Sequence, residues 1–410
     1  MLRFGPSVLL HYPSLMRVLY AYNYHRGGNG SLNATATTVR LVREHGFQVE
    51  EFTTNSKDLP DNLWGRLTAA ANAFYAPQAI KEFRKTLDSF KPDVVHAYDV
   101  FPLISPWIFP ICVRRNIPVV MTCDDYFLTC PVRNHFRNGK ICTKCLGGRE
   151  FYALVHNCRG NLPESLTLSV YTTMLRMLRL VTNNVSRLIV SSEFTRRWMG
   201  EHTGIDSSRI DLVSHSIDIP KTAADPGEGK YVAFGARFVP EKGIDTFLEA
   251  ARICHLPFRL SRNKNFFVNV VLPPHAEVVV TTGRKDLEAF YRSARMLVVP
   301  SVWFETFGLV GAESMSHGVP VIGADIGAIA DLIENGVDGL LFEPGNARDL
   351  AEKVTRLWSD TDLCRRLGRN ARAKAMRLWN PQTHVKGLIE TYSKAIAKAR
   401  TGTMQSKKAS

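Results

Sequence analysis

The sequence predicts an α/β protein of two doubly wound, parallel-sheet domains that face each other across a cleft. Short runs rich in valine and isoleucine alternate with helical patterns along nearly the whole chain, and such runs are typical of strands covered on both faces. The alternation stops once, at residues 219–230, and then starts again. A chain of 410 residues is also too long for one ordinary hydrophobic core.

The first domain is expected to cover residues 16–218. Its opening strand, at 16–22, leads into a glycine loop and then into a helix from about Leu32 to His45. Residues 1–15 are predicted to be a poorly ordered extension. Further strands are expected at 47–53, 93–98, 118–123, 187–192 and 211–216, with helices ending near Phe90 and following Pro106. This alternation predicts a Rossmann-like domain.

The second domain follows a linker at 219–230, where proline, glycine, aspartate and lysine are concentrated. It is expected to cover residues 231–380 and to be Rossmann-like as well. Its predicted strands are 231–237, 278–283, 296–301, 320–325 and 339–343, and its first helices are 241–253, 284–294 and 308–317. A last helix, 381–399, is expected to pack back on the first domain. Residues 400–410 are predicted to be a disordered, polar tail.

The formal net charge of +14 favours anionic partners. No module with interleaved basic and aromatic residues indicates nucleic acid. The alternatives are a generally basic solvated surface, phosphorylated small molecules or an anionic membrane surface. No stretch is apolar enough to span a bilayer, and no export signal is recognisable, which predicts a cytoplasmic protein. The helix at 166–187 is either a core helix or an attachment to the inner face of the cell membrane.

The segment ETFGLVGAE (305–313) carries the sharpest signal. It lies between a predicted strand and a predicted helix, where Gly308 allows close approach of a ligand. The free N–H groups of Phe307, Gly308 and Leu309 would point at an anion such as a diphosphate. Glu313 would accept hydrogen bonds from a ribose diol, and Glu305 from sugar hydroxyls.

A second loop, GARFVPEKG (235–243), carries two cations, Arg237 and Lys242. Together they offer a guanidinium fork and a point charge to a leaving diphosphate. Each motif alone could be a helix cap or a surface ion pair. The four charged residues of both loops together favour a donor site.

These two motifs, in this order, resemble those of retaining glycosyltransferases of the GT-B fold, family 4 (the group 1 type), and the resemblance covers about residues 16–393. It implies that Arg237, Lys242 and Glu305 are catalytic and that a hexose-type sugar is transferred from a nucleotide-diphosphate sugar. The implied acceptor is a glycan or a lipid-linked or lipopolysaccharide-type molecule. No cofactor and no catalytic metal are expected. A nucleotide-sugar epimerase of the same fold, or a non-catalytic carbohydrate- or membrane-binding relative, is the alternative.

The acceptor side departs from this family pattern. The paired glycines of the family match Gly27 and Gly28, in a loop whose sequence lacks the dinucleotide-binding G-x-G-x-x-G pattern of nicotinamide-dependent oxidoreductases. Where relatives often have His-x-His, this chain has His96 followed by Tyr98 and then Asp99. A histidine expected after the next strand is also absent. His96, Tyr98 and Asp99 are the residues predicted to line the acceptor cleft. A histidine inside an apolar strand is more often a core residue, and this is the alternative for His96. In the donor domain, a glycine-rich turn of relatives is replaced by FRLSRNKNFF (258–267), which leaves the nucleotide base open.

A cysteine cluster occupies an insertion at residues 124–165. Cys130, Cys142, Cys145 and Cys158 include one pair separated by two residues, a spacing that suits a tetrahedral structural zinc. Four unligated thiols, or two disulfides in an exported protein, are the alternatives.

Overall fold

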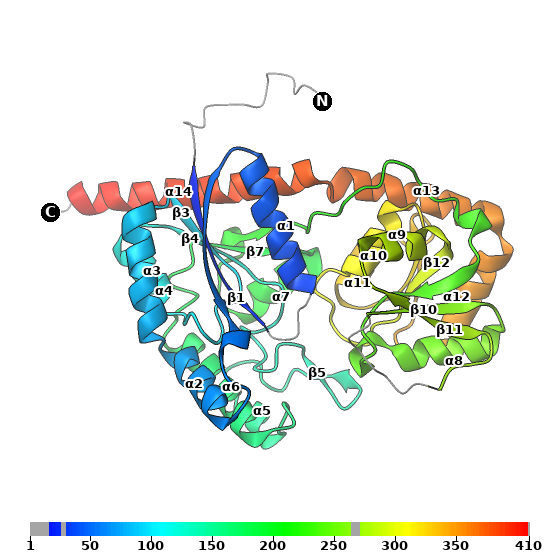
Figure 1. Ribbon diagram of the computed structural model, residues 1–410, viewed down its shortest axis with the longest axis horizontal. Helices are drawn as coiled ribbons and strands as arrows, with labels where there is room; N and C mark the ends of the chain where they lie inside the picture. The colour runs from blue at the N-terminus through cyan, green and yellow to red at the C-terminus, as the bar shows by residue number, and fades with distance from the viewer. Residues whose placement is uncertain (1–15, 26–29, 264–270, 409–410) are drawn as a thin grey trace.

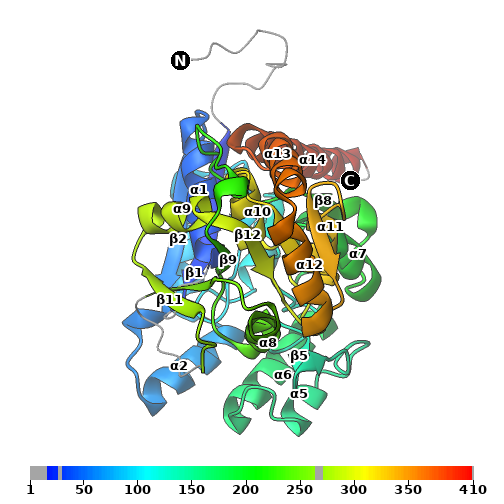
Figure 2. The ribbon, with the colours of Figure 1, turned by 90° about the vertical axis from the view of Figure 1, so that its right-hand side faces the viewer.

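The computed structural model describes residues 16–25, 30–263 and 271–408, and these residues form two α/β domains placed side by side (Figures 1 and 2). The predicted extension at 1–15 lies outside the described residues. The first domain has a six-stranded sheet in which every neighbouring pair is parallel. Across the sheet, the strands are β2 (Gln48–Asn55), β1 (Arg17–Tyr24), β3 (Val94–Ala97), β4 (Val119–Thr122), β7 (Arg187–Val190) and β8 (Ile210–Leu212).

Helices connect these strands, and a small insertion follows β4. The helices are α1 (Gly30–Glu44), α2 (Leu63–Phe74), α3 (Pro77–Phe90), α4 (Ile108–Arg114), α5 (Tyr152–Val155), α6 (Leu162–Met177) and α7 (Glu193–His202), with the 3₁₀ turns η1 (Ser56–Asp58) and η2 (Ser207–Arg209). The insertion contains an antiparallel hairpin of β5 (Phe136–Arg137) and β6 (Lys140–Ile141). The single helix expected to end at Phe90 is two helices, because Pro77 starts a new helix after an extended Tyr75.

The second domain repeats the plan with another six-stranded parallel sheet. Its strands are β11 (Ala276–Thr281), β10 (Phe258–Asn263), β9 (Tyr231–Phe234), β12 (Ala294–Val299), β13 (Val321–Ala324) and β14 (Gly339–Phe342). Its helices are α8 (Ile244–Cys254), α9 (Arg284–Arg292), α10 (Leu309–Ser316), α11 (Gly327–Leu332), α12 (Ala347–Ser359) and α13 (Thr361–Leu378), with the turns η3 (Pro226–Glu228) and η4 (Pro240–Lys242). The two doubly wound parallel sheets predicted from the sequence are confirmed.

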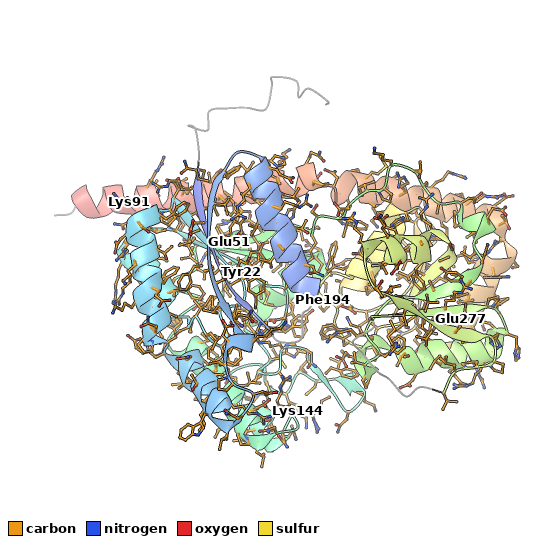
Figure 3. The ribbon with its side chains drawn as sticks, in the orientation of Figure 1. Tyr22, Glu51, Lys91, Lys144, Phe194 and Glu277 are labelled. Carbon is orange, nitrogen blue, oxygen red and sulfur yellow. The ribbon has the colours of Figure 1, made fainter. Side chains whose placement is uncertain are left out.

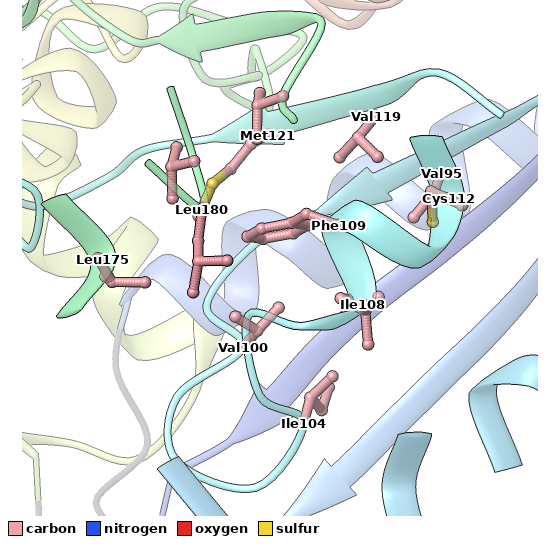
Figure 4. Close-up of a cluster of buried hydrophobic side chains, with 14 of the residues drawn as sticks. Val95, Val100, Ile104, Ile108, Phe109, Cys112, Val119, Met121, Leu175 and Leu180 are labelled. Atoms are coloured by element: carbon pink, nitrogen blue, oxygen red, sulfur yellow. The ribbon is translucent and has the colours of Figure 1, made fainter. Parts of the chain in front are cut away.

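The central strands are apolar on both faces because helices cover both. All four residues of β3 and of β9, and all six of β12, are buried. Figure 4 shows α4 beside the sheet, where Ile108, Phe109 and Cys112 belong to the same buried cluster as Val95 and Met121. Burial of apolar area of this kind provides the main driving force for folding.

The chain returns to the first domain at its end. Helix α14 (Pro381–Lys408) contacts α1, β3, β4 and β7, and Figure 1 shows it running along the edge of that domain. Helix α14 extends to Lys408 and so includes most of the segment for which the sequence predicts a disordered tail. Once a helix is nucleated by packing, each added residue costs little, and residues 400–408 contain no proline. No helix of the described chain is long and apolar enough to cross a membrane.

Candidate active site

The donor loop connects β12 to α10 and has the geometry of an anion site. Gly308 caps α10 with a positive φ of 91°, and a Cβ at this position would lie 2.6 Å from Ile329 Cδ1. None of the described residues accepts a hydrogen bond from the amide N–H groups of Phe307, Gly308 or Leu309. These N–H groups are therefore available at the positive end of the helix dipole.

Glu305 and Lys242 form a buried ion pair in front of this helix. Lys242 Nζ lies 2.6 Å from Glu305 Oε1, and Ser301 Oγ donates to the same oxygen at 2.7 Å. Burial by itself would raise the pKa of the Glu305 carboxyl, but Lys242 and Ser301 hold it below its ordinary value. Lys242 also lies 4.8 Å from the centre of the Trp303 ring. The two loops found in the sequence are thus brought together at one point.

Gly243 makes this meeting possible. Its φ is 69°, and a Cβ there would lie 1.8 Å from the carbonyl oxygen of Pro300. Only glycine lets the 235–243 loop pack so closely against the end of β12. Arg237, in contrast, is exposed and forms no ion pair with another described residue. Its guanidinium is free to reach a ligand.

Glu313 lines a separate cavity of about 450 Å³ between the domains. Asn33 and Thr37 of α1 form one wall, and Glu313 and Leu309 of α10 lie on the other. Tyr291 donates its hydroxyl to Glu313 Oε2 at 2.8 Å. Burial raises the pKa of Glu313, and this hydrogen bond opposes the shift only in part. Lys242 and Glu305 do not line this cavity.

The side chain of Phe307 is not free to contact a ligand. It is 5% exposed and packs against Trp379, with ring centres 5.8 Å apart, and against His215. The contact predicted at this position is that of the backbone N–H, which does not require an exposed ring. The Phe307 side chain is buried in the core because its ring has a large apolar area.

The donor loop also touches the first domain. Thr306 Oγ1 donates to the carbonyl oxygen of Asp124 at 3.1 Å, and Thr306 O accepts from Ser191 Oγ at 3.1 Å. Phe304 packs on Phe194, whose place at the junction of the domains is labelled in Figure 3. The donor loop is therefore in direct contact with the carboxyl ends of β4 and β7.

A polar cavity of about 120 Å³ lies on this side of the first domain, at the ends of β1, β3 and β4. Its wall includes Tyr98 and Asp99, as the sequence predicts, together with Arg133 from the insertion. Arg133 forms ion pairs with Asp99 and, at 3.2 Å, with Asp125. His25 Nε2 lies 2.9 Å from Asp99 Oδ2. Burial would raise the pKa of Asp99, but Arg133 and His25 hold it well below its ordinary value.

Comparison with known proteins identifies the family. Residues 217–374 match the family described as Glycosyl transferases group 1, and residues 28–221 match Glycosyltransferase Family 4. The chain belongs to the group 1, family 4 glycosyltransferases. Both matched regions meet at the linker, so the family covers the donor and the acceptor domain alike.

Three similar proteins illustrate the range of this family. A D-inositol 3-phosphate glycosyltransferase of Salinispora arenicola is 37% identical over 53% of this chain and 56% of its own length. The sulfoquinovosyl transferase of Arabidopsis thaliana is 24% identical over 90% of this chain and 71% of its own. Anabaena HepE in complex with UDP and glucose has a TM-score of 0.61 at 17% identity, covering 92% of this chain and 99% of that chain, which supports the GT-B fold. The inositol-phosphate relatives are matched over only about half of their length.

His96 does not line the cavity that contains Tyr98 and Asp99, and of its two interpretations the core histidine is the one that the structure shows. The ring is fully buried, with Nδ1 2.7 Å from the Tyr392 hydroxyl and Nε2 2.8 Å from Thr122 Oγ1. Burial lowers the pKa of His96 to about 3, so the ring is neutral. Helix α14 supplies Tyr392 and covers the position, a long-range contact that the local sequence does not reveal. Gly27 and Gly28, also predicted for this cleft, lie outside the described residues.

His215, which was not predicted from the sequence, lies near the end of β4, where the family resemblance implies a histidine. His215 Nε2 lies 3.3 Å from Asp124 Oδ1, and Asp124 lines the cavity where relatives have a histidine. His215 comes from the loop after β8, so nearly a hundred residues separate it from Asp124 in the sequence. Arg133 and Asp125 were missed for the same reason. A histidine directly after a strand of the same sheet was the available signal.

The four clustered cysteines are free thiols that lie near one another. Burial raises the pKa of Cys145 to about 12, and Cys130, Cys158 and Cys142 add to the shift. Within the described chain, which includes all four cysteines, no three His, Cys, Asp or Glu side chains are placed to hold one ion. The observed arrangement does not fit a tetrahedral metal site, and the structural zinc stays a prediction.

Proposed function

We propose that this protein transfers a hexose-type sugar, with retention of configuration, from a nucleotide-diphosphate sugar to a hydroxyl group of a glycan or lipid-linked acceptor. The observation that carries the proposal is the largely buried Lys242–Glu305 pair in front of the N–H groups at the start of α10, which bond to none of the described residues. Next to it, Glu313 lines a cavity large enough for a nucleoside. A cation, a helix N-terminus and two carboxylates are thereby gathered along one wall.

In the proposed reaction, the bond between the anomeric carbon and the diphosphate oxygen breaks as the acceptor oxygen bonds to the same carbon. The acceptor attacks from the face of the leaving group, and its proton passes to the departing phosphate. Lys242, Arg237 and the N–H groups of α10 stabilise the negative charge that develops on the diphosphate. Glu305 orients Lys242 and accepts hydrogen bonds from sugar hydroxyls. Glu313 holds the ribose.

The acceptor is proposed to present a neutral, hydroxyl-rich end to the first domain. Its cavity contains three carboxylates, Asp99, Asp124 and Asp125, against the single guanidinium of Arg133. Carboxylates accept hydrogen bonds from hydroxyls and repel a phosphate or carboxylate. The cavity therefore suits the end of a sugar better than an anionic group.

The experiment incubates the purified protein with UDP-, GDP- and ADP-sugars and follows nucleotide release by mass spectrometry, first without acceptor and then with neutral glycosides and sugar phosphates. UDP-sugars come first, since HepE binds UDP. Hydrolysis of one donor, lost in Glu313→Ala and Lys242→Met, and an α-linked product from an α-linked donor by NMR, are expected. Release of an isomerised sugar without acceptor would indicate the epimerase alternative. Binding of nucleotide without any turnover would indicate a non-catalytic relative.

A further inference from the structure

Helix α6 exposes a row of apolar side chains. The face turned to the protein buries Tyr171 and Leu175 together with Ser165, Ser169 and Thr172. Leu162, Leu166 and Val170 lie on the outside. Leu162, Leu166 and Val170 follow one another at four-residue intervals and so form one stripe on the helix. Each is about half exposed, at 56%, 47% and 47%. A surface helix of a soluble protein ordinarily turns such a stripe inwards.

The neighbouring helices α2 and α5 extend this stripe into a patch. Trp64 and Leu63 of α2 are 74% and 70% exposed, and Val155 of α5 is 64% exposed. Among the described residues, 20 large hydrophobic side chains are exposed, and 11 of them belong to these three helices or to the residues adjoining them. We name these 11 residues the apolar patch: Leu63, Trp64, Leu67, Tyr75, Phe151, Val155, Leu162, Leu166, Val170, Met177 and Leu178. A concentration of this kind marks an interaction surface.

The surroundings of the apolar patch are basic. Between residues 137 and 179 the sequence has seven arginines and lysines but only two glutamates. Those two, Glu150 and Glu164, are already paired with Arg176 and Arg159. Four exposed cations form no ion pair with any described residue: Lys140, Lys144, Arg149 and Arg179. The patch therefore carries a net positive rim.

The patch is held firmly and lies at the acceptor end of the first domain. Buried Glu150 accepts from Arg176 Nε at 2.6 Å and so ties α5 to α6, while Trp107 Nε1 donates to Phe74 O at 2.9 Å at the end of α2. Helix α2 follows the carboxyl end of β2, and the insertion with α5 follows the carboxyl end of β4, the edge where the acceptor cavity lies. Figures 1 and 2 show α2, α5 and α6 together at this end of the domain, and Figure 3 labels Lys144 there.

We propose that the apolar patch docks the protein on an anionic lipid bilayer, with the side chains of α2, α5 and α6 entering the interface and the basic rim contacting lipid phosphates. Apolar side chains flanked by unpaired cations are the combination that binds such surfaces. This docking would present the acceptor cavity to molecules embedded in the membrane. A second copy is the weaker occupant, because pairing patch to patch would bring two positive rims together.

The experiment is co-sedimentation of the full chain with vesicles of phosphatidylcholine alone and of phosphatidylcholine with phosphatidylglycerol. Binding is expected only to the anionic vesicles and should weaken with salt. Leu63→Ser/Trp64→Ser and Lys144→Glu/Arg149→Glu should each weaken it by about tenfold or more. The matched controls are Val337→Ser, an exposed apolar side chain on the other domain, and Lys81→Glu/Lys85→Glu on α3; both should bind like the unchanged protein.

Entry of the apolar patch into the bilayer is tested by fluorescence. Phosphatidylglycerol with brominated acyl chains should quench tryptophan emission, and Trp64→Phe should remove that quenching while binding is kept. Donor hydrolysis in solution should be unaffected in all these variants, so the docking and the proposed transferase activity can fail separately. Equal vesicle binding by the patch variants and the controls would overturn the proposal. So would a patch-dependent dimer, or a patch-dependent protein complex, in a chain that does not bind vesicles.

Discussion

The proposed donor and acceptor walls of the candidate active site are built in different ways. The donor wall consists of two continuous loops whose shape is set by glycines with positive φ, Gly243 and Gly308. The acceptor wall is assembled from side chains of several segments, in which Arg133 of the insertion joins Asp99 after β3 and Asp125 after β4. A continuous loop leaves a motif in the sequence, whereas a network of distant residues leaves none. The two walls should therefore respond differently to substitution.

The largest effect is expected from Lys242→Met, which removes the cation of the donor wall. Loss of charge stabilisation at the leaving diphosphate should lower kcat by about 100-fold or more. In the unchanged protein the pKa of Glu305 is lowered, so its ionisation contributes stability that is present above about pH 4.3 and is lost as the pH falls. In the variant, Ser301 still opposes the effect of burial but the lysine no longer does, so the pKa of Glu305 should rise and the stabilising contribution of its ionisation should fall.

Urea unfolding at several pH values checks this prediction. The stability difference between the unchanged protein and Lys242→Met should grow as the pH rises from about 4 to 7. Lys230→Met, an exposed lysine of the same domain, is the control and should leave both kcat and stability unchanged. A difference that does not vary with pH would show that Glu305 does not depend on Lys242.

A second effect is expected on the acceptor wall from Arg133→Met. Asp99 and Asp125 would lose their shared cation, at a cost of about 2 kcal/mol of unfolding free energy, below the range for a fully buried pair because about a third of each carboxylate is exposed. The KM for acceptor should rise while donor hydrolysis continues. Arg137→Met, a nearby arginine without an ion pair to described residues, is the control. If Arg133→Met lowered donor hydrolysis as much as it impaired the use of the acceptor, the two walls would not respond differently to substitution.

His96→Gln tests where the acceptor wall ends. The substitution disturbs the hydrogen bonds with Tyr392 and Thr122 and should cost about 1–2 kcal/mol of stability. Because the ring is buried behind the wall, kcat and both KM values should stay within about twofold once the protein is folded. Thermal unfolding and steady-state kinetics measure the two quantities. Altered acceptor KM at unchanged stability would place His96 in the cleft after all.

The smallest effect is expected from Tyr291→Phe, which removes one hydrogen bond to Glu313. Nucleotide affinity should fall by roughly three- to tenfold, because Glu313 loses part of its orientation. Tyr231→Phe is matched to it, since that hydroxyl is also buried but donates to the carbonyl of Phe290. Isothermal titration with the nucleotide distinguishes the two. Equal losses in both variants would mean that Glu313 does not hold the ligand.

The sequence alone determined the two parallel sheets, their linker and the donor loops. Strand and helix patterns repeat locally, and a glycine-capped helix start is a local feature, so both can be read over a few residues. The motifs predicted that Lys242 and Glu305 belong to one donor site, but the ion pair between them was not predicted. The length of α14 did not follow, because the polar composition of residues 400–408 suggested disorder whereas helix propagation from a packed segment prevailed.

Only the tertiary structure decided the acceptor wall and the burial of individual side chains. His96 became a core residue because Tyr392, 296 residues away, covers it. Contacts between separate segments place His215 beside Asp124 and Arg133 beside Asp99. Packing also decided the exposure of the stripe on α6. Its residues Leu162, Leu166 and Val170 are apolar, yet they face outward. Local patterns specify which residues can be buried, and long-range packing specifies which of them are.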